Sequence, residues 1–301
     1  MNGSDQHGTR FVFVTSYGRS GSTILSDMLS RHPDVGFVSN LDDRFRRLPS
    51  WWQRVNPTVY HHLPQRFTTK GRVLRFAPSE GWRLLEREVS SILAGARRPL
   101  TAEDASPWLT ERLRDFFTSR AAIQQRSFFV HKLTGWPHVG LLRVAFPDAR
   151  FVHVVRDGRA VADSDLRTTW WPGFAGPQAL LGEALSPEDE AVWVASGRSY
   201  AVLAALAWRL AMRETRAARA TVPPESWMDV RFEDLLARRE VVFERMAGFL
   251  DLPPCPSFDA WVQRTVLHAD RQDGYRRHLP AATVGHVESA VADELARWGY
   301  V

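Results

Sequence analysis

A short glycine- and hydroxyl-rich segment, TSYGRSGSTIL, follows the apolar run FVFV near the start of the chain. Arg19 adds a positive charge beside Gly21, and Ser20, Ser22 and Thr23 add hydroxyl groups. A turn of this kind presents consecutive backbone N–H groups at the positive end of a helix dipole, so it predicts a pocket for a phosphate-like anion. The segment matches neither G-x-x-x-x-G-K-[ST] nor G-x-G-x-x-G, and it is therefore not a standard nucleotide-binding loop. The alternative is a Gly/Ser-rich connection without a ligand.

A second anion-binding pattern occurs in FVHVVRDGRAVADS. A strand-like run ends at Arg156, an Asp-Gly turn follows, and Ser164 lies in the first turns of the predicted helix. Open α/β sheets bind ligands at the carboxyl ends of their strands. We therefore expect Arg156 and Ser164 to converge on a second anion, although Arg156 alone would be interpreted as a surface arginine at a strand end.

The elements around these patterns predict an α/β fold. Strand-like runs cover residues 11–15, 34–38, 127–131, 150–155 and 227–232. The helical segment STILSDMLSRH separates the first two runs, and this βαβ arrangement indicates parallel strands. Residues 42–126 are aromatic, arginine-rich and mostly helical, with Ser106 and Pro107 as N-cap and first helical residue. We predict a helical insertion there, within a single domain that spans residues 1–301.

Composition limits the class of protein. The most apolar segment, AVLAALAWRLAM, is short and contains Arg209, so it is predicted to be a buried helix and not a membrane span. The first residues lack the apolar core of a secretory signal, and Cys255 is the single cysteine, so we expect a cytoplasmic location. The net charge of +5 indicates anionic partners. Of the 39 basic residues only Lys70 and Lys132 are lysines, which marks positions where arginine would not serve equally well.

Together the two patterns resemble the sulfotransferases that use PAPS (3′-phosphoadenosine 5′-phosphosulfate), in particular the bacterial and tyrosylprotein-type branch. GRSGSTILSDMLSRHPDV is similar to their 5′-phosphosulfate loop, and RFVHVVRDGRAVADS is similar to their 3′-phosphate motif. VHKLTG, MDVRFEDLL and ELARWGY extend the resemblance. It implies a P-loop-like three-layer α/β fold with a central parallel sheet. It also implies transfer of the sulfuryl group from PAPS to a hydroxyl of a small-molecule acceptor, with PAP as product and without a metal.

The resemblance also implies the roles of individual residues. Arg19 would stabilise negative charge on the leaving phosphate oxygen, and Lys132 matches the lysine that reaches the sulfuryl group. The alternative for Lys132 is a surface lysine at a strand end. The residues implied to bind PAPS are Arg19, Ser20, Gly21, Ser22 and Thr23 at the 5′-phosphosulfate, and Arg156 and Ser164 at the 3′-phosphate.

The general base departs from the family pattern. Related enzymes often carry a glutamate after the second strand, but Asn40 occupies this position, and an amide cannot usefully accept a proton. The nearest carboxylates are Asp42 and Asp43, and His131 is a separate candidate beside Lys132. We favour Asp42 or Asp43. The alternatives are helix N-terminal roles for the aspartates and a half-buried strand position for His131.

Tryptophans in the loops and in the insertion predict an acceptor that is partly aromatic or lipid-like. Most of them would nevertheless belong to the core, with the pair before Pro172 as the exception. The tryptophans considered are Trp51, Trp52, Trp82, Trp136, Trp170 and Trp171.

Two other functions compete with sulfuryl transfer. A P-loop-like small-molecule kinase would require the lysine that the glycine-rich segment lacks. A nucleic-acid-binding protein is suggested by the isoelectric point near 9.8. Such a protein would need a basic stripe, whereas the arginines here are spread along the chain, so no nucleic-acid partner is expected.

Overall fold

Five parallel strands form a central sheet in the computed structural model, which describes residues 8–45, 49–63, 76–267 and 272–300. The strand order is β2-β3-β1-β4-β5. Each strand coincides with a predicted run, so all five strand predictions are confirmed. The strands are β1 (Arg10–Ser16), β2 (Val35–Phe37), β3 (Phe128–Thr134), β4 (Arg150–Val155) and β5 (Trp227–Arg231).

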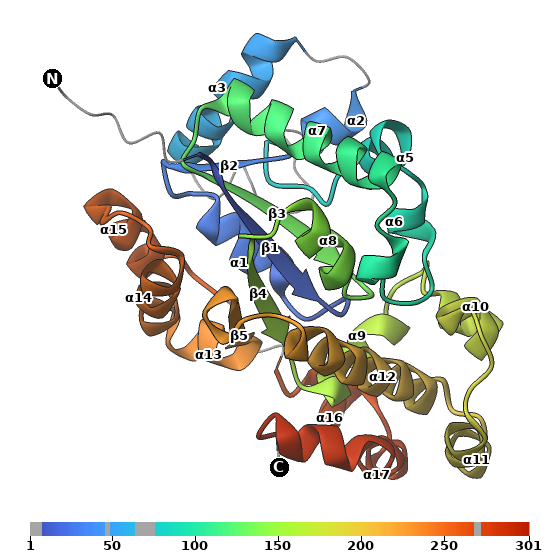
Figure 1. Cartoon of the computed structure of the whole chain (residues 1–301). Helices are drawn as coiled ribbons and strands as arrows, with labels where there is room; N and C mark the ends of the chain where they lie inside the picture. Colours follow the sequence, from blue (N-terminus) through green and yellow to red (C-terminus); the bar gives the residue numbers. More distant parts are fainter. Residues whose placement is uncertain (1–7, 46–48, 64–75, 268–271, 301) are drawn as a thin grey trace, which may run out of the picture.

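Helices cover both faces of this sheet, which gives three layers (Figure 1). Successive side chains of a strand point to opposite faces. Phe13 accordingly packs into the core under α7 (Pro107–Gln124) and α8 (Val139–Ala145), while Val12 and Val14 pack into the core under α1 (Ser22–Leu29). Because both faces are buried, the strands are nearly continuous apolar runs.

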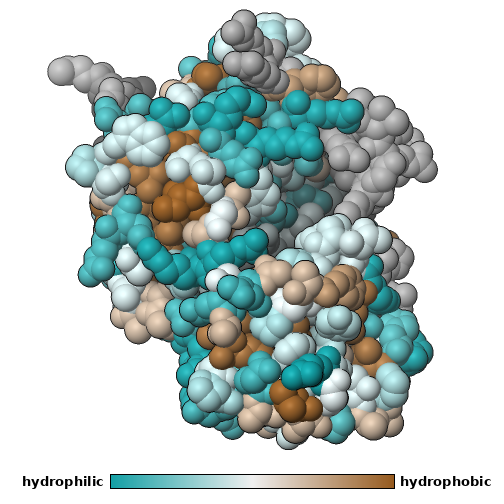
Figure 2. All heavy atoms as spheres, turned by 90° about the vertical axis from the view of Figure 1, so that its right-hand side faces the viewer, coloured by the Kyte–Doolittle hydropathy of each residue, from teal (hydrophilic) through white to brown (hydrophobic). Residues whose placement is uncertain are grey.

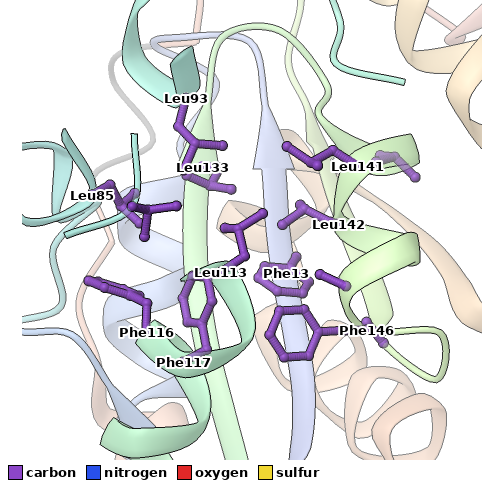
Figure 3. Close-up of a cluster of buried hydrophobic side chains, with 14 of the residues drawn as sticks. Phe13, Leu85, Leu93, Leu113, Phe116, Phe117, Leu133, Leu141, Leu142 and Phe146 are labelled. Atoms are coloured by element: carbon purple, nitrogen blue, oxygen red, sulfur yellow. The ribbon is translucent and has the colours of Figure 1, made fainter. Parts of the chain in front are cut away.

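Aromatic side chains fill the core on the α7 face (Figure 3). Phe117 of α7 packs edge-on against Phe13 of β1, with ring centroids 5.5 Å apart, and Phe146 after α8 closes the group. Helix α7 begins as predicted, with Pro107 as its first residue and the Ser106 hydroxyl accepting a hydrogen bond from Leu109 N–H. The aromatic residues of this part of the chain therefore anchor helices to the sheet.

The described residues between β2 and β3 are mainly helical. The elements are α2 (Asn40–Arg44), α3 (Ser50–His62), α5 (Trp82–Glu88), α6 (Ile92–Gly95), a 3-10 turn (Ala102–Asp104) and α7. The extent of the insertion and the single domain remain predictions.

The described residues after β3 form helices and connecting turns, apart from β4 and β5. The apolar segment predicted to be a buried helix lies in α12, and none of the helices within the described ranges is long and apolar enough to cross a membrane. The remaining helices are α9 (Gly158–Leu166), α10 (Pro177–Leu181), α11 (Pro187–Ala195), α12 (Tyr200–Ala220), α13 (Phe232–Ala237), α14 (Arg239–Leu250), α15 (Pro256–Arg264), α16 (Gly274–His278) and α17 (Ala281–Arg297), with 3-10 turns at Pro172–Ala175 and Pro224–Ser226.

One local expectation was wrong. Lys132 lies inside β3 and not after the strand, because β3 continues to Thr134 alongside β1. After β5 the chain forms two helices, α13 and α14, which are separated at Arg238, where the backbone leaves the helical region at φ −142° and ψ 46°.

Candidate active site

The glycine-rich segment connects β1 to α1 through a tight turn. Gly21 is the N-cap of α1 and has φ 90°, a left-handed conformation that favours glycine. A Cβ atom at this position would lie 2.2 Å from the Phe232 ring of α13. Arg19 also has a positive φ, of 67°. The turn is therefore held tightly against α13, and glycine is required at position 21.

The turn retains the capacity to bind an anion. No side chain caps the N-terminus of α1. The first N–H groups of a helix have no partner within the helix, and here they are the groups that could bind an anion. The Ser20 hydroxyl is buried and has no hydrogen-bond partner within the described ranges. The Ser22 hydroxyl, in contrast, accepts a hydrogen bond from Ser16 at 2.8 Å. A buried unpartnered hydroxyl beside an uncapped helix N-terminus fits a phosphate-like group.

The second predicted anion site lies directly beside the first. Arg156, at the end of β4, is buried and donates a hydrogen bond from Nη1 to the Arg19 carbonyl at 3.0 Å. Burial lowers the pKa of Arg156. The Arg19 side chain crosses to α9, where its Nε donates to the Ser164 hydroxyl at 2.9 Å. The structure thus brings Arg19, Arg156 and Ser164 together.

Lys132 joins the glycine-rich turn from the other side. Its Nζ donates to the Thr23 hydroxyl at 2.8 Å, and its side chain is only 9% exposed. Strand β3 is the neighbour of β1, which places the lysine next to the start of α1. Within the described ranges, no three His, Cys, Asp or Glu side chains gather in a way that could hold a metal ion.

The three base candidates all have structural roles. Asp42 is buried and closes a capping box, accepting hydrogen bonds from Ser39 N–H at 2.9 Å and from the Ser39 hydroxyl at 2.7 Å. Burial raises the pKa of Asp42. Asp43 accepts a hydrogen bond from Leu84 N–H at 3.1 Å. These contacts tie both aspartates to the backbone of α2 and α5, and among the described residues no hydrogen bond or ion pair links either aspartate to Lys132.

His131 is buried in the aromatic core and lies 4.9 Å from the Phe117 ring. It neighbours Lys132 along β3 but points to the opposite face of the sheet. Burial, with Lys132 nearby, lowers the pKa of His131 to about 3. This geometry favours a packing role for the histidine.

The capping role of Asp42 leads to a stability prediction. An Asp42→Ala variant is expected to lose about 0.5–2 kcal/mol of unfolding free energy, because the capping box is removed. Turnover of the folded variant should remain within a few-fold of wild type. Chemical denaturation and steady-state kinetics check the two expectations, and a loss of turnover at unchanged stability would return Asp42 to the role of base.

A carboxylate that was not predicted from the sequence, that of Glu80, lies beside Lys132. Glu80 precedes α5, and its Oε1 is 3.3 Å from Lys132 Nζ. The same oxygen accepts a hydrogen bond from the Thr134 hydroxyl at 2.7 Å, and Oε2 accepts one from Trp82 Nε1 at 2.5 Å. No local sequence pattern distinguishes Glu80 from other acidic residues of the insertion, because only the fold brings it to β3.

The segments RFEDLL and RWGY, which extend the resemblance, contact each other and the turn that follows Arg156. Glu233 of α13 accepts hydrogen bonds from Asp157 N–H at 3.1 Å and from the Tyr300 hydroxyl at 2.8 Å. Arg159 of α9 donates to the Tyr300 carbonyl at 2.8 Å. RFEDLL and RWGY therefore brace the turn that follows Arg156.

A pocket of about 200 Å³ is lined in part by the two residues that donate hydrogen bonds to Glu80. Its walls combine aromatic, aliphatic and polar side chains, among them Tyr17, Trp82, Thr134, Trp136 and Leu181. Figure 2 shows the right-hand side of Figure 1, on which patches of hydrophobic side chains lie among hydrophilic ones.

The other tryptophans considered for an acceptor pocket do not line it. Trp170 is 70% exposed, and Trp171 is buried against Phe174. Trp52 packs against Phe76, and Trp51 packs edge-on against Trp52. Of the six tryptophans considered for an acceptor pocket, Trp82 and Trp136 therefore line it.

Comparison with known proteins agrees with this geometry. A family model described as "Sulfotransferase family" matches residues 12–256, which include both anion-binding segments and Lys132. The chain is 23% identical over 245 residues to protein-tyrosine sulfotransferase A of Caenorhabditis elegans. That alignment covers 81% of this chain but 50% of the relative, so the chain spans about half the length of the curated relative that it matches.

Solved structures show the same fold. Sulfotransferase STF9 from Mycobacterium avium is 16% identical, with a TM-score of 0.55 over 96% of this chain and 76% of that one. The sulfotransferase domain from the curacin biosynthetic pathway is 13% identical, with a TM-score of 0.52 over 95% of this chain and 98% of that domain. The predicted P-loop-like three-layer fold with a central parallel sheet is confirmed.

Proposed function

Because this chain belongs to the sulfotransferase family, we propose that it transfers the sulfuryl group of PAPS to a hydroxyl of a small-molecule acceptor, giving PAP and a sulfate ester. The observation that carries the proposal is the contact between the two anion-binding segments. Arg19 lies in one of them and donates a hydrogen bond to Ser164 of the other at 2.9 Å. A ligand with two separate anionic groups fits such a pair of adjoining sites, and PAPS has a 5′-phosphosulfate and a 3′-phosphate.

The residues of this chain would have the following roles. The N–H groups at the start of α1, with the Ser20 hydroxyl, would bind the 5′-phosphosulfate, and Arg156 and Ser164 would bind the 3′-phosphate. When bound, PAPS supplies an activated sulfuryl group on a good leaving group. Lys132 and Arg19 would stabilise the negative charge that develops as the bond to the leaving phosphate breaks. Sulfuryl transfer, like phosphoryl transfer, depends mainly on such positioning and charge stabilisation.

Nucleotide selectivity tests this proposal. Adenosine 3′,5′-bisphosphate at one hundred times its Kd is expected to stabilise the folded chain by about 2.7 kcal/mol, seen as a higher melting temperature. ATP with Mg²⁺ at the same concentration should give a smaller shift, and an oligonucleotide should give no specific shift. A larger shift with ATP and Mg²⁺ would favour the kinase, and saturable stabilisation by the oligonucleotide alone would favour the nucleic-acid-binding protein.

The pocket lined by Trp82 and Trp136 supports a partly aromatic or lipid-like acceptor. Trp82 and Trp136 provide flat apolar walls, and Thr134 provides a polar group at the end nearest Lys132. Mass spectrometry of a metabolite mixture incubated with the enzyme and PAPS is expected to reveal compounds that gain one sulfo group. Products confined to acidic glycans would contradict the acceptor class but not the sulfuryl transfer.

We propose further that the reaction proceeds without a bound metal and in the cytoplasm. Arg19 and Lys132 together can stabilise the charge for which kinases use Mg²⁺. Turnover is therefore expected to be unchanged after treatment with EDTA, and an activity that returns only with a divalent cation would contradict this part of the proposal.

A further inference from the structure

Glu80 occupies a position in the site that nucleotide binding does not explain. Its side chain is 22% exposed and contacts Lys132 as well as two residues that line the pocket. The groups that hold it are Trp82 Nε1 on one oxygen, and Lys132 and the Thr134 hydroxyl on the other. Trp82 and Thr134 both line the pocket, so the carboxylate is joined directly to its wall. A hydroxyl group bound at this end of the pocket would lie close to both Glu80 and Lys132.

Asn40 holds the segment that carries this glutamate. Its Nδ2 donates to the Ala77 carbonyl at 2.9 Å and to the Pro78 carbonyl at 3.3 Å. The backbone adds two bonds, from Asn40 N–H to Ala77 at 3.0 Å and from Ser79 N–H to Val38 at 2.7 Å. Residues 76–80 thus dock along the end of β2. Asn40, which occupies the position where a carboxylate was expected, therefore fixes the backbone of the segment that carries Glu80.

We propose that Glu80 is the general base of the reaction and that Asn40 is its positioning residue. This inference rests on the proposed function. As the acceptor oxygen attacks sulfur, a new O–S bond forms and the S–O bond to the leaving phosphate breaks, with its electron pair remaining on the phosphate oxygen. The acceptor proton passes to a carboxylate oxygen of Glu80. Lys132, 3.3 Å away, stabilises the charge on the leaving side of the same step.

Another carboxylate, that of Asp27, lies near Lys132. Asp27 of α1 is largely buried, and burial raises its pKa to about 7, with Lys132 and Arg31 acting in the opposite direction. Within the described ranges no hydrogen bond links its side chain to a residue that lines the pocket, whereas two residues of the pocket wall, Trp82 and Thr134, donate hydrogen bonds to Glu80. Glu80 is therefore better placed than Asp27 to meet an acceptor, and Asp27→Asn serves as the competing variant.

Acceptors of different acidity test the proposal. With PAPS as donor, Glu80→Gln is expected to lower kcat with phenol by roughly 10²- to 10⁴-fold. The loss should be much smaller with 4-nitrophenol, whose hydroxyl ionises readily and needs less help from a base. Glu80→Asp should restore part of the activity with phenol. Glu86→Gln, a change of the same chemistry at an exposed position of α5, should match wild type.

The outcomes separate this inference from the proposed function. Unchanged turnover of Glu80→Gln overturns it. An equal loss with both phenols also overturns it, because Glu80 would then act only by positioning Lys132. Loss in Asp27→Asn with full activity in Glu80→Gln assigns the base to Asp27. If wild type is stabilised by PAP but sulfates neither phenol, the acceptor found by mass spectrometry replaces them, and a loss below tenfold overturns the inference. Failure of PAP to stabilise wild type contradicts the proposed function itself.

Discussion

Replacing Lys132 with methionine is expected to lower kcat by roughly 10²- to 10³-fold, the loss typical when one group that stabilises transition-state charge is removed. Methionine is unbranched and of similar length, so it preserves most of the packing of a side chain that is 9% exposed. The Kd for PAP should change only a few-fold, because PAP lacks the sulfuryl group that Lys132 is proposed to reach. Steady-state kinetics and PAP titration by calorimetry measure the two effects separately.

Lys132→Arg provides the matched control. Arginine keeps the positive charge but replaces a compact ammonium with a planar guanidinium. The space between the Thr23 hydroxyl and Glu80, at 2.8 and 3.3 Å from the lysine nitrogen, does not suit this larger group. We therefore expect the arginine variant to recover only part of the activity. Full activity in both variants would remove Lys132 from the mechanism.

Features encoded in short segments were predictable from the sequence. The five strands are mostly apolar runs because both faces of the sheet are covered. The turn at Gly21 is recognisable for two reasons. A left-handed backbone favours glycine, and a glycine-rich turn before a helix N-terminus is typical of anion-binding sites. The proximity of Arg19 to Arg156 was also predictable, since parallel strands bring their carboxyl ends to one edge of the sheet.

The position of the carboxylate beside Lys132 was not predictable in this way. Glu80 reaches the site because residues 76–80 dock against residues 38–40, and no periodicity or short motif reports such a contact. The roles of Asp42 and Asp43 were difficult to predict for a related reason. A carboxylate three residues after Ser39 is typical of a capping box and also suits a general base, and only the hydrogen bonds distinguish the two roles.

Replacing Arg156 with alanine is expected to weaken PAP binding by roughly 30- to 5,000-fold. This range corresponds to about 2–5 kcal/mol for truncating one partner of a buried, charged contact. The loss should depend on the 3′-phosphate. Adenosine 5′-monophosphate, which lacks this group, should lose only the smaller contribution that Arg156 makes by bonding the Arg19 carbonyl. Calorimetric titration of both nucleotides against wild type and variant measures the difference.

Arg167→Ala is the control for this experiment. Arg167 follows α9 and pairs with Asp163, but its side chain is 52% exposed, so its removal should change PAP affinity little. An Arg156→Ala variant that loses both nucleotides equally would indicate damage to the glycine-rich turn and not loss of a phosphate contact. A variant that binds PAP as wild type does would place the 3′-phosphate elsewhere. Selective loss of PAP is the result expected if Arg156 and the Gly21 turn bind opposite ends of one nucleotide.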